Sequence, residues 1–465
     1  MNMIINGYQI REKIYESSQS FIYRGYRDQD NLPVIFKTIK ESYPNSITLS
    51  QFKQEYEILK NLNFPGVIKT YGLEQYQNSL VIILEDFGGV PLNFLLNQKL
   101  LTLKECLEIC LKIVDSLADI HRADIIHKDI NPTNIIIQPE TQQVKLIDFG
   151  ISTQLSSEDA SLCDPNLIEG TLAYMSPEQT GRMNRKIDYH TDFYSLGVTF
   201  YEMLTGQLPF TTDDPIELVH FHLAKQPVSP HQVNPEIPPI ISSICLKLLT
   251  KTAEERYQSA EGVKADLTKC LAEITKNSTI KNFVLGQKDI SEKFQIPQKL
   301  YGREEEIKSL IDSFEKVMQG QNEMVLVSGY SGIGKSVLIK EINPIITQKR
   351  GYFITGKFEQ FKRDIPYSSV IQACQELVYQ LLTECDQKIN QWRQEILTAL
   401  GINGQVIIDV IPEIEQIIGP QPEIPQLEAT QAQNRFNLVF QNFLKVFTKA
   451  QHPLVIFLDD LQWAD

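Results

Sequence analysis

Three oxygen-bearing side chains stand at spacings that suit the transfer of a phosphoryl group. Residues 125–134 read IIHKDINPTN, so Asn134 follows Asp129 by five positions, and Asp148 comes 14 positions later in the sequence IDFG. A phosphoryl-transfer site must orient a hydroxyl nucleophile and hold Mg²⁺ against the phosphates, and Mg²⁺ prefers carboxylate and amide oxygens. We therefore take Asp129 as a candidate base, and Asn134 and Asp148 as candidate Mg²⁺ ligands.

A charged pair upstream supplies the positive group that such a site needs. Lys37 ends the strand-like sequence VIFK, where its ammonium group would hold the α- and β-phosphates of ATP. Apolar residues at positions 52, 56, 59 and 62 predict an amphipathic helix, with Ser50 as its N-cap. Glu55 lies on the polar side of that helix and would pair with Lys37.

A second phosphate-binding pattern lies near residue 330. GYSGIGKS, from Gly329 to Ser336, satisfies G-x-x-x-x-G-K-[ST]. The glycines of this turn, with Gly332 and Gly334 inside it, would present backbone amides to phosphates. Lys335 would reach the β- and γ-phosphates of a nucleotide, and the Ser336 hydroxyl would bind Mg²⁺.

The surroundings of this pattern predict an α/β unit. MVLVSG before the turn is typical of a buried strand, and KSVLIKEI after it is typical of a helix. A further buried strand in VIFLDDLQWAD ends in Asp459, which would bind the metal through water, and Asp460, which would act as base or orient water. The chain stops at Asp465, before a parallel sheet of this type would be complete, so we expect a C-terminally truncated unit.

Length and composition limit the remaining possibilities. A chain of 465 residues predicts two or three domains. Its 44 basic and 58 acidic residues give a formal charge of −14, which argues against a general nucleic-acid binder. No signal peptide or membrane span is evident, and the seven scattered cysteines include no C-x-x-C pair, so we expect a cytoplasmic protein.

The pattern along the chain predicts its organisation. Short strand-like runs dominate the first hundred residues and helical spacing dominates to about residue 270, so we expect a small strand-rich lobe followed by a larger helical lobe. Residues 271–299 are polar and weakly periodic, which is typical of a linker. The expected fold is thus a bilobal α+β unit over 8–270, followed by an incomplete α/β P-loop unit over 300–465.

Residues 8–270 resemble a protein kinase in the order of their motifs. HKDINPTN resembles the catalytic loop, DFG the metal-binding turn, and GTLAYMSPEQ (170–179) the substrate-side loop. The resemblance implies that Asp192 braces the catalytic loop and that Arg256 pairs with Glu178. It also implies that ATP and Mg²⁺ are cofactors, that Asp129, Lys37 and Glu55 are catalytic, and that Thr171 favours serine/threonine acceptors.

The same resemblance places the adenine of ATP. Ile14 and Ile22 would contact the nucleotide from the first two strands. Leu84 would stand at the back of the pocket, and the hinge from Glu85 to Phe87 would lie beside the base.

Three departures from the kinase pattern bear on activity. Tyr15, Ser17 and Ser20 replace the glycines of the loop that covers the phosphates. Asn131 replaces the lysine that offsets charge on the transferred group, and Lys128 replaces the arginine of the H-R-D triplet. Two readings follow: an active but slow kinase, or a scaffold that binds ATP without transferring phosphate.

The second unit resembles the regulatory ATPases of signalling proteins through LYGREEE before the P-loop and DDLQWAD after it. A kinase followed by this ATPase resembles the large bacterial multidomain serine/threonine and histidine sensor kinases. The resemblance implies nucleotide-dependent regulation and possible self-association through the ATPase. A further reading makes the ATPase the main activity and the kinase lobe an interaction module. The protein substrate, the stimulus and the activating phosphosite do not follow from the sequence.

Overall fold

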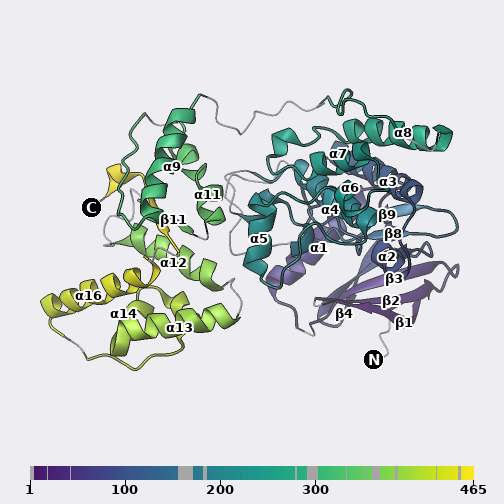
Figure 1. Cartoon of the computed structure of the whole chain (residues 1–465). Helices are drawn as coiled ribbons and strands as arrows, with labels where there is room; N and C mark the ends of the chain where they lie inside the picture. Colours follow the sequence, from purple (N-terminus) through teal and green to yellow (C-terminus); the bar gives the residue numbers. More distant parts are fainter. Residues whose placement is uncertain are drawn as a thin grey trace.

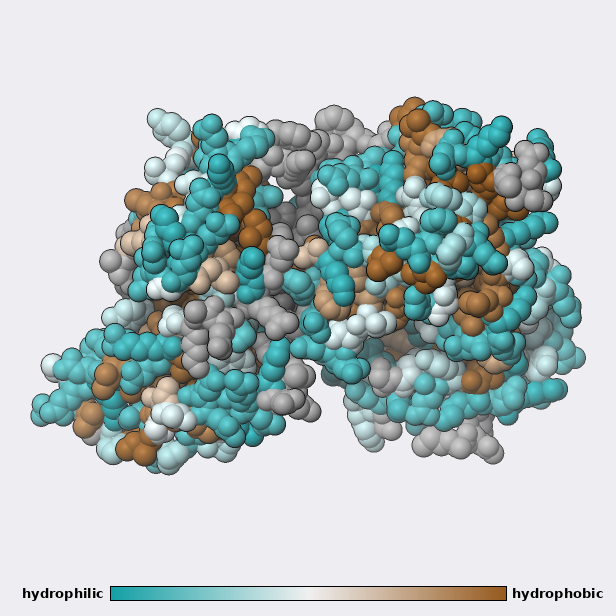
Figure 2. Space-filling model, viewed as in Figure 1, coloured by the Kyte–Doolittle hydropathy of each residue, from teal (hydrophilic) through white to brown (hydrophobic). Residues whose placement is uncertain are grey.

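The computed structural model places two units side by side (Figure 1). It describes residues 5–17, 19–41, 43–154, 171–181, 186–277, 280–290, 302–330, 332–349, 351–358, 367–382, 386–425, 427–448 and 452–464. We call residues 5–290 the N-terminal unit and residues 302–464 the C-terminal unit. Hydrophilic side chains cover most of the face of both units that Figure 2 shows. Within the described residues, no helix is both long and apolar enough to cross a membrane.

The N-terminal unit begins with an antiparallel sheet in the order β1-β2-β3-β5-β4. Its strands are β1 (Tyr8–Glu16), β2 (Ser20–Arg27), β3 (Pro33–Ile39), β4 (Thr70–Tyr76) and β5 (Ser79–Glu85). Alternate residues of a strand point to opposite faces. Phe36 and Ile83 therefore pack in a small outer core, whereas Ile82 joins the main core of the unit. Lys37 pairs with Ile82 across the strands, so both lie on the face turned toward the rest of the unit.

Helix α1 (Ser46–Asn61) packs beside this sheet. Its N-cap is Asn45, whose side-chain oxygen accepts a hydrogen bond from the Thr48 amide at 2.8 Å. The predicted cap at Ser50 is wrong, because the helix already includes that residue. Glu55 is buried on α1 despite its place on the polar side of the sequence pattern.

The larger lobe is mainly helical and surrounds one apolar core. Its helices are α2 (Leu92–Gln98), α3 (Leu103–Arg122), α4 (His190–Thr205), α5 (Pro215–Ala224), α6 (Pro230–Val233), α7 (Pro239–Leu248) and α8 (Ala260–Asn277). Short strands lie between β5 and α4: β6 (Val90–Pro91), which precedes α2, and β7 (Ile125–Ile126), β8 (Ile135–Ile137), β9 (Val144–Leu146) and β10 (Thr153–Gln154), which follow α3. The β8–β9 hairpin brings residues 134 and 147 together, since the Ile147 amide donates to the Asn134 carbonyl at 3.0 Å.

The first half of the predicted linker packs against the N-terminal unit. Helix α8 continues to Asn277, and Phe283 and Leu285 contact the main core. The Asp289 carboxylate accepts hydrogen bonds from the backbone amide of Gln258 at 2.9 Å and from the Ser259 hydroxyl at 2.9 Å. Residues 280–289 are therefore part of the packed unit, while 291–299 of the predicted linker lie outside the described residues. The boundaries proposed from sequence otherwise stay predictions.

The C-terminal unit contains a parallel pair of strands, β11 (Tyr352–Lys357) and β12 (Leu454–Asp459). Its helices are α9 (Glu304–Met318), α10 (Lys335–Lys340), α11 (Asn343–Gln348), α12 (Ser368–Leu382), α13 (Asp386–Leu400), α14 (Gly404–Ile408), α15 (Glu415–Ile418) and α16 (Ala429–Phe447). One apolar core joins α9, α10 and α11 to β11. A second apolar core includes residues from all five helices from α12 through α16. Between α10, which begins at Lys335, and β12, which ends at Asp459, the chain forms mainly helices, with β11 as the one strand among the described residues.

The predicted strand before the P-loop is not formed. Residues 321–330 form neither a strand nor a helix, and the side chains of Met324 and Leu326 are 95% and 75% exposed. A strand is stabilised by hydrogen bonds to a neighbouring strand, and none of the described residues supplies one here. The helix after the turn does begin at Lys335, as predicted.

Candidate active site and nucleotide sites

Lys37 links two acidic residues from different elements. Its Nζ lies 2.7 Å from Oε1 of Glu55 on α1, and 2.8 Å from Oδ1 of Asp148 after β9. Lys37 and Glu55 are largely buried, while the Asp148 side chain is 46% exposed. This arrangement places one ammonium group beside one accessible carboxylate, and it pairs Lys37 with Glu55.

The charges of this cluster shift its pKa values. Burial by itself would lower the pKa of Lys37, but the carboxylates of Asp148 and Glu55 outweigh burial and raise it. Burial raises the pKa of Glu55. The positive charge of Lys37 lowers the pKa of Asp148, so that Asp148 is ionised at neutral pH, as a metal ligand must be.

The catalytic loop fixes Asp129 and Asn134 against each other. The Asn134 side-chain amide donates to Oδ2 of Asp129 at 2.8 Å and to its carbonyl at 2.9 Å. No hydrogen bond to the amide oxygen of Asn134 is found among the described residues. The Asn134 nitrogen therefore holds the base candidate, and its oxygen is left for a metal.

Asp192, at the start of α4, holds the backbone of this loop. Its carboxylate accepts hydrogen bonds from the amides of His127 at 3.0 Å and Lys128 at 2.8 Å. His121 on α3 adds a third contact at 2.8 Å. Burial would raise the pKa of Asp192, but the hydrogen bond and charge of His121 lower it. This role of His121 does not follow from the sequence pattern, since nothing in its spacing distinguishes it from other helical residues.

Asn131 connects the catalytic loop to the substrate-side segment. Its side-chain nitrogen donates to the Thr171 hydroxyl at 3.2 Å, and its oxygen accepts from the Thr133 amide at 2.9 Å. The Thr171 amide donates to Oδ1 of Asp129 at 2.9 Å. Asn131 is 1% exposed. Asn131 thus joins the two segments through an uncharged side chain, at the position where the kinase resemblance predicts a lysine.

Ser17 closes the loop between β1 and β2. Its Oγ accepts hydrogen bonds from the amides of Gln19 at 3.2 Å and Ser20 at 2.9 Å. These are backbone donors of the loop that would cover the phosphates of ATP. The Ser17 hydroxyl therefore serves the turn itself.

The residues predicted to contact adenine lie on or directly after strands of the N-terminal sheet. Ile14 is at an irregularity in the pairing of β1, and Ile22 on β2 pairs with Lys37. Glu85 ends β5, and its carboxylate lies 2.7 Å from Nζ of Lys145. The same ammonium group lies 5.3 Å from the ring centre of Phe87. Lys145, which the sequence analysis did not single out, thus connects the two hinge residues.

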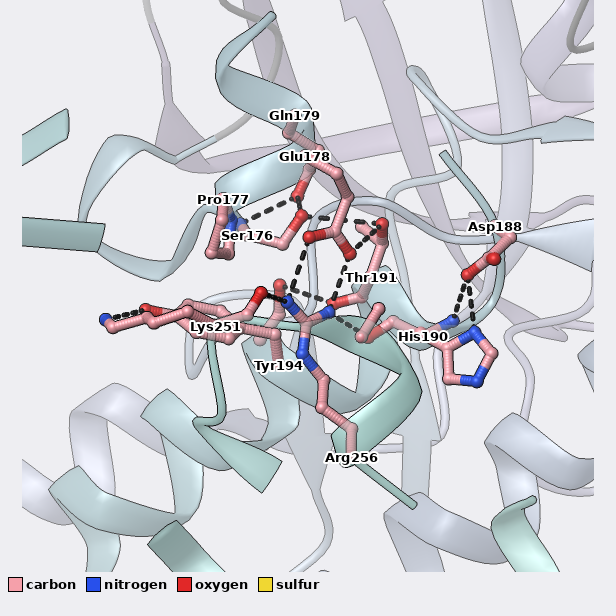
Figure 3. A network of polar contacts seen from close by, with 12 residues as sticks. Ser176, Pro177, Glu178, Gln179, Asp188, His190, Thr191, Tyr194, Lys251 and Arg256 are labelled. Carbon is pink, nitrogen blue, oxygen red and sulfur yellow. Dashed lines mark hydrogen bonds and ion pairs between the residues drawn. The ribbon is translucent and has the colours of Figure 1, made fainter. Parts of the chain in front are cut away.

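A buried ion pair supports the substrate-side segment (Figure 3). Two nitrogens of Arg256 contact the Glu178 carboxylate at 2.6 and 2.9 Å, and both side chains are fully buried. Glu178 lies in the 3₁₀ helix η3 (Pro177–Thr180), which follows η2 (Leu172–Tyr174). Thr191 also donates to Glu178 at 2.9 Å. Gln179, missed from sequence, donates to the Lys128 carbonyl at 2.8 Å and so joins this segment to the catalytic loop.

In the C-terminal unit, the two halves of the predicted nucleotide site meet. The Ser336 hydroxyl donates to Oδ2 of Asp459 at 2.7 Å, although 123 positions separate them. Nζ of Lys335 donates to the carbonyls of Gly329 at 3.0 Å and Tyr330 at 3.1 Å. Asp460 lies 3.4 Å from Nζ of Lys357.

The backbone of this turn requires glycine at two positions. Gly332 has φ of 81° and Gly334 has φ of 91°, a region that side chains disfavour. The predicted phosphate-binding turn thus has the backbone conformation that its glycines permit, with Lys335 and Ser336 directly after it.

The donor sets fit nucleotide and Mg²⁺ in both units. Asp148 offers an oxygen atom beside Lys37 and Asn134 offers one beside Asp129. Ser336 and Asp459 offer oxygen atoms directly after Lys335 and at the end of β12. Within the part of the chain that the structure describes, no three His, Cys, Asp or Glu side chains gather into a metal site. With two protein oxygen ligands at each site, Mg²⁺ would take phosphate oxygens and water as its further ligands, which is the usual arrangement for this ion in nucleotide sites.

A two-lobed fold with this lysine, base and metal-ligand arrangement defines the class of protein kinases. Comparison with known families agrees: the protein kinase domain matches residues 8–267, which is more than half of the chain. The chain therefore belongs to the protein kinase family. The AAA ATPase domain matches residues 299–465. The chain is thus a protein kinase domain fused to an AAA ATPase domain, and such domains use ATP, generally with Mg²⁺.

Similar proteins include signalling kinases of several kinds. Hybrid signal transduction histidine kinase G of Dictyostelium discoideum is 39% identical over 315 residues, or 63% of this chain and 9% of that protein. Histidine protein kinase 1 of Candida albicans is 24% identical over 400 residues, or 77% and 16%. Serine/threonine-protein kinase PrkC of Bacillus subtilis is 32% identical over 238 residues, or 50% and 36%. The chain spans well under half the length of each of these relatives.

Proposed function

We propose that the N-terminal unit transfers the γ-phosphoryl group of ATP to serine or threonine hydroxyls of a protein substrate. The observation that carries this proposal is a pair of contacts on neighbouring segments: Lys37 contacts Asp148 and Asn134 contacts Asp129, each at 2.8 Å. The Ile147 amide, next to Asp148, donates to the Asn134 carbonyl at 3.0 Å and so brings the two segments together. The similarity to serine/threonine kinases supports the choice of acceptor.

Each side chain would have one task. Asp129 would accept a hydrogen bond from the substrate hydroxyl and orient it toward the γ-phosphate. Lys37, held by Glu55, would bind the α- and β-phosphates. Asp148 and Asn134 would hold Mg²⁺, which neutralises phosphate charge when it is bound.

Transfer of radiolabelled phosphate from ATP tests this proposal. The full chain with Mg²⁺ should label itself or a generic protein acceptor, and phosphoamino-acid analysis should find phosphoserine or phosphothreonine. Asp129→Ala should lower the rate about 10²–10⁴-fold, the usual range for a positioned base. Incorporation equal to that of Asp129→Ala would refute transfer.

Two observations favour the runner-up, a scaffold that binds ATP without transferring it. Ser17 uses loop amides that would meet phosphate, and Asn131 supplies no positive charge. That alternative predicts ATP binding to the N-terminal unit that Lys37→Met removes, together with no labelling above Asp129→Ala.

We also propose that the P-loop of the C-terminal unit binds a nucleotide with Mg²⁺. The Ser336–Asp459 contact, beside Lys335, supports it. Titration with a fluorescent ATP analogue should give two sites per chain, and either Lys37→Met or Lys335→Ala should reduce this to one. Two sites in Lys335→Ala would refute the P-loop assignment.

The reading in which ATP hydrolysis by the C-terminal unit is the main activity makes a different prediction. In that case Lys335→Ala would abolish the activity of the chain, whereas Asp129→Ala would leave it unchanged.

Cytoplasmic location and self-association through the C-terminal unit stay predictions. Light scattering on the purified chain at several concentrations would test the second.

A further inference from the structure

Helix α5 lies next to the substrate side of the kinase unit. It packs against η2 and η3, the segment that directly follows Thr171. Because the Thr171 amide donates to Asp129, α5 is separated from the base candidate by one layer of structure.

The inner face of α5 is firmly seated. Leu218, Val219 and His222 are buried, and the Tyr194 hydroxyl contacts Nδ1 of His222 at 3.0 Å. Lys251 donates to the Phe221 carbonyl at 3.1 Å. Any protein that approaches this helix must therefore use its outer face or its ends.

The C-terminal unit contacts α5 in two independent places. Helix α11 packs against α5, and Figure 1 shows the two helices facing each other across the two units. Separately, Nζ of Lys388, on α13, lies 3.2 Å from Oδ2 of Asp214, the residue before α5. The other oxygen of Asp214 accepts from the Glu217 amide at 3.4 Å, so the same carboxylate serves as a cap of α5.

Helix α11 is part of the piece of structure that carries the P-loop. Ile342 and Ile346 share an apolar core with Leu338 of α10, the helix that begins at Lys335. The contact with α5 is therefore made close to the candidate nucleotide site of the ATPase.

We propose that α5, with Asp214, is the docking surface of the kinase unit for the ATPase unit of the same chain. Helix α11 covers the helix, and Lys388 fixes the register through Asp214. While the units are docked, the covered part of α5 is closed to other proteins, and the P-loop piece rests against the substrate side of the kinase.

Zero-length carbodiimide cross-linking of the full chain tests this docking. The reagent joins a carboxylate to an amine only when the two groups touch. A surface ion pair contributes little to stability, so a geometric readout is sharper than a stability measurement. The Lys264–Asp115 pair is a matched internal control, since it lies wholly within the kinase unit at 2.7 Å.

We expect a peptide linked through Asp214 and Lys388, at a yield within about threefold of the control link. Asp214→Asn and Lys388→Arg, which remove the reactive groups but little else, should each lower that link at least tenfold and leave the control link unchanged. In a mixture of ¹⁵N-labelled and unlabelled protein, the linked peptides should carry a single isotope.

Two results would overturn the proposal. One is a normal control link without the Asp214–Lys388 link. The other is a link of mixed isotopes, which would place the contact between chains. The readout depends on distance and not on phosphoryl transfer, so an inactive kinase would leave this test intact.

Discussion

At Ser17, a hydroxyl group takes two backbone amides that a phosphate would otherwise meet. The amides belong to Gln19 and Ser20, in the loop between β1 and β2. Replacement of the loop glycines therefore does more than restrict the backbone. It supplies an internal acceptor that would compete with a bound nucleotide for these amides.

Removal of this acceptor should strengthen ATP binding. We expect Ser17→Ala to lower the Kd for ATP about 2–10-fold, because each freed amide gains a hydrogen bond of about 0.5–1.5 kcal/mol to phosphate. The measurement is a titration in the Lys335→Ala background, which silences the second site. Ser243→Ala, which removes a hydroxyl on α7 far from this loop, is the control. Weaker binding in Ser17→Ala would show that the hydroxyl helps to hold phosphate.

Asn131 differs from Ser17, because its side chain holds the substrate-side segment through the hydrogen bond to Thr171. Asn131→Ala should lower the rate of phosphoryl transfer about 2–10-fold, the effect of one lost hydrogen bond to Thr171. The same change in a Thr171→Ala background should cost much less, since the partner is already gone. Asn61→Ala, on the exposed side of α1, is the control. Equal losses in both backgrounds would contradict the anchoring role.

At the scale of elements, the substrate-side segment depends on the buried pair of Glu178 and Arg256. Removal of one partner leaves an uncompensated charge in the interior. We expect Arg256→Ala to lower the free energy of unfolding of the kinase unit by about 3–5 kcal/mol in denaturant titrations. Lys264→Ala breaks an exposed pair and should cost less than about 1 kcal/mol. Similar losses for both variants would argue against the buried pair as a support.

Lys251, which links α5 to α4, should make stability depend on pH. Burial, with a smaller effect of Arg256, lowers its pKa from 10.5 to about 7. Between these values the unfolded chain binds more protons than the folded chain, so the free energy of unfolding should rise with pH. The rise is at most about 1.4 kcal/mol per pH unit.

Lys251→Met removes this titration and should flatten that part of the profile. Urea unfolding at several pH values from 6.5 to 10 measures it, with Lys247→Met as the control. An unchanged slope would assign the dependence to other groups.

Elements were predicted well where local pattern decides them and poorly where neighbours do. Helix α1 follows from its apolar spacing, but its cap at Asn45 depends on where the chain turns after β3. Residues 324–328 have strand-forming composition, yet no strand forms, because pairing needs a neighbour that sequence pattern does not provide. Lys37, Glu55 and Asp148 were found because their chemistry and order are distinctive. His121 and Gln179 were missed because their roles depend on packing between distant segments.

For the whole molecule, residues 280–289 extend the kinase unit past the predicted boundary. A fragment of residues 1–290 should be more stable than one of 1–270 by about 3 kcal/mol or more, given the apolar contacts of Phe283 and Leu285 and the Asp289 hydrogen bonds. Thermal and urea unfolding of the two fragments measure the difference. Asp289→Ala in the longer fragment should remove part of this extra stability. Equal stability of the two fragments would contradict the packing described above.

Residues 324–328 form an apolar run that pairs with no strand among the described residues, and this has a practical consequence for work on the chain. The backbone donors and acceptors of this run, flanked by exposed methionine and leucine side chains, can pair with an extended peptide, including the same segment of another copy. Concentrated samples should therefore become turbid sooner than their net charge of −14 would suggest, and a lysine at position 326 should keep them clear.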